Sequence, residues 1–145
     1  MLPLEVPWNP FDFADPGPCI KISVMPTEDE MQLGIGLDYP RPLPISALLD
    51  SGAHTTIINK VLAINRKLTM TNARVRVSGV GGPCLCDEYA CSISFPNSDL
   101  PPIGTLKILA GDFDREPYSG LIGRDIFKLW RVIFDGKSRR VTVSA

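Results

Sequence analysis

Apolar and polar residues alternate along much of the chain, and this pattern predicts β-strands. Ile20, Ile22 and Val24 alternate with polar residues, and residues 33–37 alternate Leu or Ile with Gly. A period of two places the apolar side chains on one face of a strand, where they can be buried. Apolar, alternating or β-branched runs predict further strands at residues 45–49, 55–58, 74–78, 85–95, 105–110, 132–134 and 140–143. The pattern therefore predicts an all-β domain.

Turn sequences between predicted strands indicate two hairpins. The strand at residues 74–78 runs into the glycine-rich segment 79–83 and returns through residues 85–95. Glycine allows backbone angles that other residues avoid, so this tip should be a conformationally loose hairpin end. Near the C-terminus, Asp135-Gly136 is a favourable turn sequence and predicts a terminal hairpin.

A helix is predicted late in the chain, at residues 124–130. Ile126, Phe127 and Trp130 lie at helical spacing and would share one face. Residues 60–72 carry apolar residues at mixed spacing, so either a short helix or a loop fits this segment. The acidic segment at residues 27–30 is expected to be a turn between two strands.

Residues 1–18 differ from the rest because they contain five prolines, with Trp8, Phe11 and Phe13 between them. Proline at this density prevents both a helix and a central strand, so the segment should be an extended arm. The arm is expected to pack on its own domain, and the alternative is that it crosses to a partner subunit or occupies a cleft. The predicted organisation is thus an N-terminal arm at residues 1–18 and one domain at residues 19–145.

The composition agrees with one globular domain and excludes several classes of partner. The 145 residues are 44% hydrophobic and 21% charged, with a net charge of −1. No basic block is present, so neither nucleic acid nor an anionic membrane is expected as a partner. The sequence shows neither an apolar run of about 20 residues nor a secretory signal, so a cytoplasmic location is expected.

Four cysteines raise the question of a metal site. Cys84, Cys86 and Cys91 are close in sequence, and His54 is the single histidine. Structural zinc sites usually have two to four residues between paired cysteines, whereas this pair has one. Free thiols are therefore expected at these positions and at Cys19, with no metal and no cofactor.

One acidic residue directly follows an apolar predicted strand. Asp50 opens the segment Asp50-Ser51-Gly52-Ala53 after the strand at residues 45–49. A carboxylate at the edge of a core must be paired, neutralised or used in chemistry. Asp-Ser-Gly is also ordinary turn chemistry, so the carboxylate could instead cap its own backbone.

A second apolar segment, at residues 120–125, reads Gly-Leu-Ile-Gly-Arg-Asp. Along the chain stand, in order, an apolar strand, the acid turn, a β-branched strand, a glycine-tipped hairpin, Leu-Ile-Gly and a late helix. This order resembles that of the retropepsin-like aspartic proteases. The resemblance extends over roughly residues 20–145. It implies a single-lobe acid-protease barrel with one short C-terminal helix, expected as a symmetric homodimer because the chain has a single acid turn.

The resemblance also implies roles for individual residues. Asp50 would be the catalytic residue, and a water held between the Asp50 carboxyls of two copies would attack the peptide bond. The active-site turn would be completed by Ser51, Gly52 and Ala53. The flap that closes over an extended peptide or protein substrate would consist of Gly79, Val80, Gly81 and Gly82. Structural support beneath the turn would come from Leu121, Ile122, Gly123, Arg124 and Asp125.

The implied function is an aspartic endopeptidase that acts as a homodimer. The alternative is a dimerisation or peptide-binding module with little or no proteolysis, because function resides in the site and not in the fold. One departure from the family concerns the residues after the turn, where retroviral members have acids and this chain has His54-Thr55. The usual carboxylate partner of Arg124 is therefore absent, so Asp125 or another acid must take its place.

Overall fold

The structure is a computed structural model that describes residues 2–9, 15–34, 41–79 and 82–145. Within these ranges the strands are β1 (Leu4–Pro7), β2 (Cys19–Met25), β3 (Ile45–Leu49), β4 (Ile57–Asn59), β5 (Thr69–Gly79), β6 (Gly82–Ser94), β7 (Ile103–Gly111), β8 (Gly120–Ile122), β9 (Arg131–Asp135) and β10 (Arg140–Ser144). The described residues also form three short helices: α1 (Glu28–Leu33), α2 (Lys60–Asn65) and α3 (Arg124–Phe127). The predicted all-β class is confirmed.

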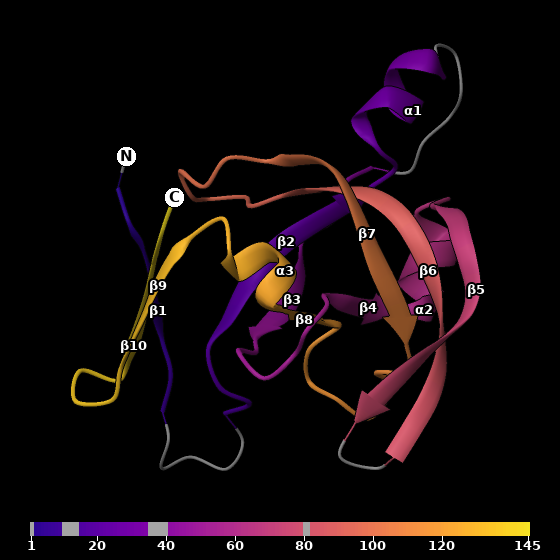
Figure 1. Cartoon of the computed structure of the whole chain (residues 1–145). Helices are drawn as coiled ribbons and strands as arrows, with labels where there is room; N and C mark the ends of the chain where they lie inside the picture. The colour runs from indigo at the N-terminus through magenta and orange to yellow at the C-terminus, as the bar shows by residue number, and fades with distance from the viewer. Residues whose placement is uncertain (1, 10–14, 35–40, 80–81) are drawn as a thin grey trace.

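The described strands form two sheets, which Figure 1 shows side by side. The larger sheet has seven strands in the order β2-β3-β8-β4-β7-β6-β5, and β2 also pairs with β6. This extra pairing places Val24 opposite Ile93 and closes the larger sheet into a barrel. The smaller sheet has the order β1-β10-β9.

The hydrophobic core joins both sheets to the last helix. Its largest fully buried aliphatic side chains are Ile22, Val24, Ile58, Ile93, Ile108, Ile122, Ile126, Val141 and Val143. Trp130 packs against this cluster, and its ring meets that of Phe95 edge-on at a centroid distance of 4.9 Å. The segment 120–126 is therefore held from within the core, at Ile122 and Ile126.

The predicted strand at residues 33–37 is wrong at its first residue, because Leu33 ends α1. The Thr27 hydroxyl accepts a hydrogen bond from the Glu30 N–H at 3.2 Å and caps the helix, and three acids fill its first turn. Negative charge at a helix N-terminus is favourable, so the acidic segment begins a helix instead of a turn. Residues 35–37 lie outside the described residues.

The undecided segment at residues 60–72 contains both a helix and the start of a strand. The Asn59 side chain accepts a hydrogen bond from the Val61 N–H at 3.0 Å and caps α2, which ends at Asn65. β5 then begins at Thr69 and forms the predicted hairpin with β6.

None of the described helices is long and apolar enough to span a membrane.

The described part of the N-terminal arm contributes a strand to the smaller sheet. β1 pairs antiparallel with β10, with Leu4 opposite Val143 and Val6 opposite Val141. β1 lies at the edge of the sheet, where proline is tolerated because no neighbouring strand needs its N–H on that side. Residues 4–7 therefore lie on the C-terminal hairpin of the same chain, and residues 10–14 lie outside the described residues.

The thiol of Cys91 offers a test of the packing in the core. Cys91 is fully buried in β6, and burial, with smaller contributions from Asp125 and Glu30, raises its pKa from 9.0 to about 12. Above pH 9 the thiol ionises in the unfolded chain but stays protonated in the folded chain, so stability is lost as pH rises toward 12. Between about pH 8.5 and about pH 10.5, we expect this thiol to lower the free energy of unfolding by about 2 kcal/mol.

Urea titrations at both pH values should measure this effect. In Cys91→Ala the contribution is absent, so its free energy of unfolding should fall by about 2 kcal/mol less than that of the wild type over the same interval. Equal pH dependence in the two proteins would contradict the buried, protonated thiol.

Candidate active site

Asp50 follows β3 directly and starts a tight turn. Its N–H donates to the carbonyl of Ile122 at 3.0 Å, and its own carbonyl accepts from the Ala53 N–H at 3.1 Å. The Asp50 Oδ1 atom accepts from the Gly52 N–H at 2.9 Å, so the carboxylate does cap its own turn. Within the described residues its second oxygen, Oδ2, accepts no hydrogen bond and can face a water or a ligand.

The segment 120–125 lies next to this turn, as the Leu-Ile-Gly sequence suggested. β8 pairs parallel with β3, with Leu48 opposite Leu121 and Leu49 opposite Ile122. Beyond the strand, the Arg124 N–H donates to the carbonyl of Ala53 at 2.9 Å. Both ends of the acid turn are thus hydrogen-bonded to the backbone of residues 122–124.

Thr56 and Asp125 form a buried polar contact behind the turn. Thr56 is 0% exposed, and its N–H donates to Asp125 Oδ2 at 3.0 Å. Its hydroxyl donates to Asp125 Oδ1 at 2.7 Å and accepts from the Gly123 N–H at 3.1 Å. Asp125 therefore anchors the chain that leaves the acid turn, while the Arg124 side chain makes no ion pair with any described residue.

Gly123 is packed too closely for any side chain. A Cβ atom built on it would lie 2.7 Å from the carbonyl carbon of Thr55 and 3.0 Å from the carbonyl oxygen of Ala53. Both are backbone atoms, so a side chain would push the acid turn away from β8. The glycine is required by this close approach, because its φ of −97° is open to any residue.

Replacing Gly123 with alanine should therefore lower the free energy of unfolding by about 3 kcal/mol or more. Gly136→Ala is the matched control, because a Cβ there would have no heavy atom within 4 Å. Its effect should stay within about 0.5 kcal/mol. Urea denaturation of both variants measures the difference, and equal stabilities would show that the turn and β8 are not in close contact.

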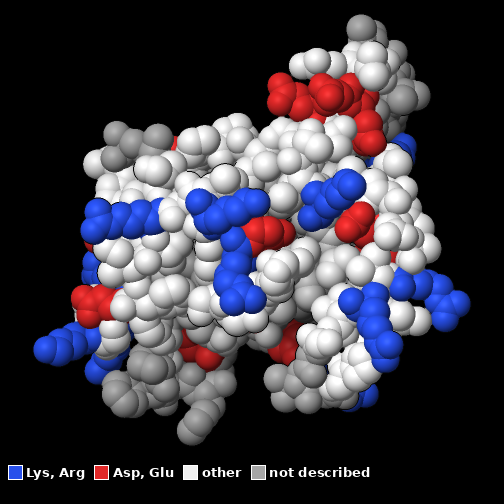
Figure 2. Space-filling model, viewed as in Figure 1, with Lys and Arg blue, Asp and Glu red and all other residues white. Residues whose placement is uncertain are grey.

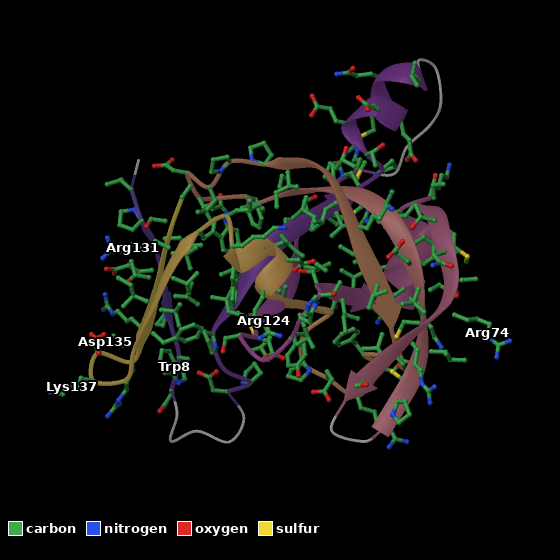
Figure 3. The ribbon with its side chains drawn as sticks, in the orientation of Figure 1. Trp8, Arg74, Arg124, Arg131, Asp135 and Lys137 are labelled. Atoms are coloured by element: carbon green, nitrogen blue, oxygen red, sulfur yellow. The ribbon has the colours of Figure 1, made fainter. Side chains whose placement is uncertain are left out.

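An open cavity of about 840 Å³ begins immediately after the turn. Its lining residues are His54, Thr55, Glu88, Thr105, Leu106, Lys107, Arg124, Asp125 and Lys128. The two carboxylates that line the cavity, those of Asp125 and Glu88, both accept hydrogen bonds within the protein. Asp125 accepts from the Thr56 N–H, and Glu88 Oε1 accepts from the Thr71 hydroxyl at 2.8 Å. Figure 2 shows basic side chains gathered on this face, and Figure 3 labels Arg124, the first residue of α3.

The charges around this cavity favour an acidic ligand. The side chains of Lys107, Arg124 and Lys128 make no ion pair within the described part of the chain. Cations that lack a protein partner can hold a carboxylate by charge-assisted hydrogen bonds. The cavity can therefore accept an acidic group of a ligand.

Tyr118 is a further polar residue near Asp50, on the loop between β7 and β8. Burial and the Glu116 carboxylate, with a smaller contribution from Asp50, raise the pKa of Tyr118. The Tyr118 hydroxyl is hydrogen-bonded to the Glu116 side chain. Its ring packs edge-on against Phe113 at a centroid distance of 6.0 Å, which orients it.

The hairpin of β5 and β6 has its last described pair at Gly79 and Gly82. Gly82 has a φ of +100°, a left-handed conformation that favours glycine. The predicted flap residues Val80 and Gly81 lie outside the described residues. On the outgoing strand, Cys84 is exposed and Cys86 is buried, with their sulfur atoms 3.9 Å apart.

No group of three or more His, Cys, Asp or Glu side chains that could hold a metal occurs in the described ranges.

Two solved structures resemble this arrangement of strands. The EIAV protease, solved in complex with the inhibitor HBY-793, matches with a TM-score of 0.56 and 19% identity over 85% of this chain and 92% of that chain. A retropepsin-like aspartic protease from Rickettsia conorii matches with a TM-score of 0.55 and 13% identity, over 98% of this chain and 90% of that chain. The chain has the retropepsin-like fold. No protein-family model matches the sequence, and no curated protein matches it significantly.

Within this retropepsin-like fold, the structure brings together most residues that the sequence singled out. Asp50 and the rest of its turn lie against residues 120–125, which come from a distant part of the chain. Sequence reasoning missed Thr56 and Tyr118. Thr56 directly precedes the apolar pair Ile57-Ile58, and this position indicates a buried hydroxyl. A buried hydroxyl needs a hydrogen-bond partner, so Thr56 could have been singled out from the sequence. No comparable signal marked Tyr118, which lies in a polar loop.

Proposed function

We propose that this protein is an aspartic endopeptidase that acts as a homodimer. The observation that supports it best is the position of Asp50, at the end of β3 on a turn tied to Ile122 and Arg124 in a retropepsin-like fold. The sequence has one such acid turn, so a second catalytic carboxyl has to come from a second copy.

In this proposal the two Asp50 carboxyls share one proton. Two carboxyls a few ångströms apart cannot both be ionised without a large electrostatic cost, so they titrate as a pair. The ionised member takes a proton from a water, and the protonated member donates to the carbonyl oxygen of the scissile bond. The attack on the peptide bond needs no covalent intermediate, metal or cofactor.

The substrate would be an extended peptide that lies between the Asp50 turn and the β5–β6 hairpin. An extended chain can add a strand to the exposed edge of a hairpin, and closure of the hairpin would exclude water. The cavity at His54 lies next to this path, so its unpaired cations would favour an acidic residue a short distance from the scissile bond.

A peptide-binding or dimerisation module is the second candidate function. It is favoured by the hydrogen bond from Gly52 to Asp50 Oδ1, because this contact explains the acid as a turn cap. His54 also stands at a position after the turn where retroviral members carry an acid. In a module of this kind the peptide would bind without being cleaved.

A peptide library, incubated with the purified protein from acidic to neutral pH, separates the two functions. The protease proposal expects cleavage by the wild type and none by Asp50→Asn, with both proteins dimeric in sedimentation velocity. A wild-type dimer that binds peptides but cleaves none would support the module. Cleavage that persists in Asp50→Asn would overturn the assignment of Asp50.

A further inference from the structure

Cys84 and Cys86 form a pair of thiols on β6, in the hairpin at the right of Figure 1. Because they stand two residues apart in one strand, their side chains lie on the same face of the sheet. Their sulfur atoms are 3.9 Å apart, close enough for one thiol to donate a weak hydrogen bond to the other. Both are free thiols, and neither lines the cavity beside the acid turn.

The pair has one accessible member and one shielded member. Cys84 is exposed, whereas Cys86 is buried. On β5, Val77 lies opposite Cys84 and Val75 lies opposite Cys86, so apolar side chains border both thiols. A ligand can therefore reach the pair from solvent at Cys84 and be shielded from water at Cys86.

The spacing of the two sulfur atoms does not suit a disulfide. On a strand, side chains two residues apart point the same way and start about 6.6 Å apart. A disulfide needs Cβ atoms about 3.5–4.5 Å apart and a sulfur–sulfur bond of about 2.05 Å. Closing this bond would bend β6, which is paired with β5 at both cysteines.

The same spacing suits a single ion that both sulfur atoms share. Zinc–sulfur bonds are about 2.3 Å long, so two sulfurs on one such ion lie about 3.8 Å apart at a tetrahedral angle and about 4.6 Å apart in a straight line. The observed 3.9 Å lies within this range. Two thiolates can therefore hold one ion here without movement of the backbone.

The number of ligands selects the kind of ion. Structural zinc needs four ligands, and the described residues contain no group of three or more His, Cys, Asp or Glu side chains that could hold a metal. Thiolates are soft ligands that favour Cu(I), and this ion is stable with two sulfur ligands alone. The one-residue spacing of the pair, which counts against zinc, is therefore no obstacle to Cu(I).

Arg76 adds a positive charge beside the exposed thiol. A small cavity of about 270 Å³ is lined by Arg76, Pro83, Cys84 and Leu85. The Arg76 side chain makes no ion pair with any residue that the structure describes. A Cu(I) ion held by two thiolates carries one net negative charge, so a neighbouring guanidinium stabilises it.

We propose that Cys84 and Cys86 bind one Cu(I) ion between their two thiolates. Each thiol releases its proton to solvent as its sulfur bonds to the ion, and the copper stays monovalent throughout. This site lies on the β5–β6 hairpin and goes beyond the proposed function, because it does not depend on peptide cleavage.

Titration with Cu(I) alone, under argon and in competition with a chromophoric Cu(I) chelator, tests the site. The wild type is expected to bind one Cu(I) per chain, with two sulfur neighbours in X-ray absorption. Cys84→Ser and Cys86→Ser each leave a single thiol and are expected to raise the dissociation constant by at least about 100-fold. Cys84 is exposed, so Cys84→Ser provides the test if Cys86→Ser does not fold by circular dichroism.

The double variant Leu85→Cys/Cys86→Ser is the matched control for geometry. It keeps two cysteines in the same tripeptide, but adjacent residues of a strand point to opposite faces. Leu85 is 55% exposed, so its replacement should not disturb the fold. This control should bind Cu(I) as weakly as the single-thiol variants. Cys19→Ser, which removes a thiol on β2, should bind Cu(I) as the wild type does.

Zn(II) alone gives a second comparison. It should bind the wild type at least about 100-fold more weakly than Cu(I), because the pair supplies two of the four ligands that zinc needs. Equal affinities for the two ions would overturn the two-ligand site.

Three other results would also overturn it: wild-type affinity in the opposite-face control, wild-type affinity in Cys84→Ser, or one Cu(I) per two chains in sedimentation velocity. Peptide cleavage by a wild type that binds no Cu(I) would keep the protease proposal and reject the copper site. Same-face binding of Cu(I) by a wild type that cleaves no peptide would keep the copper site and reject the protease.

Discussion

Asp50→Asn is expected to lower the rate of peptide cleavage by about 10³-fold or more. An asparagine can neither accept a proton from the attacking water nor share one with the partner's Asp50, so general acid–base catalysis is lost. Asparagine keeps the shape of the side chain and an oxygen that can accept from the Gly52 N–H. The turn and the dimer should therefore remain intact, and peptides should still bind.

Initial rates on a peptide that the wild type cleaves would measure this effect, with thermal unfolding and sedimentation recorded for both proteins. Asp112→Asn is the control, because Asp112 is exposed and its Oδ1 accepts a hydrogen bond from the Asp114 N–H in a similar local turn. The control should keep wild-type rates. Residual activity of about one tenth in Asp50→Asn would argue that Asp50 is a turn residue alone.

Asp125→Ala is expected to lower the free energy of unfolding by about 2–5 kcal/mol. The change removes the acceptor for the N–H and hydroxyl of Thr56, which is fully buried. Each buried donor that loses its partner costs about 1–3 kcal/mol. Because the same contact holds the chain that leaves the acid turn, any cleavage activity should fall as well.

Urea denaturation measures this loss, with Asp112→Ala as a control on the surface. The control should change the free energy of unfolding by no more than about 0.5 kcal/mol. Thr56→Val provides a second check, because it removes the hydroxyl that bonds both Asp125 and Gly123. The effects of Thr56→Val and Asp125→Ala should not add, since they remove the same contact. Equal stability of Asp125→Ala and wild type would contradict this role.

Strand positions were predictable where apolar residues alternate along the sequence. Ile20, Ile22 and Val24 lie in β2 with their side chains buried, as the period of two predicted. The same reasoning failed at Leu33, which is 87% exposed at the end of α1. There a side-chain cap and three acids at a helix N-terminus outweighed the apolar pattern, because local hydrogen bonds and charges also select backbone conformation.

The acid turn was predictable for a similar local reason. A carboxylate and a glycine directly after an apolar strand form a tight turn, and Asp50 and Gly52 are hydrogen-bonded within it. The short distance in sequence between these two residues made their contact foreseeable. The role of Asp125 was open, because its partner Thr56 stands 69 positions earlier in the chain.

The sequence by itself determined most of the strands, the acid turn at Asp50 and the presence of one such turn per chain. These features depend on neighbours in the sequence, through side-chain periodicity and turn chemistry. The tertiary structure decided that Asp125 holds Thr56, that β2 closes the barrel against β6, and that β1 pairs with β10 and leaves β9 open. These contacts join segments that are distant in the sequence. Which of these segments become neighbours depends on the burial of the whole hydrophobic core, and short sequence patterns do not contain that information.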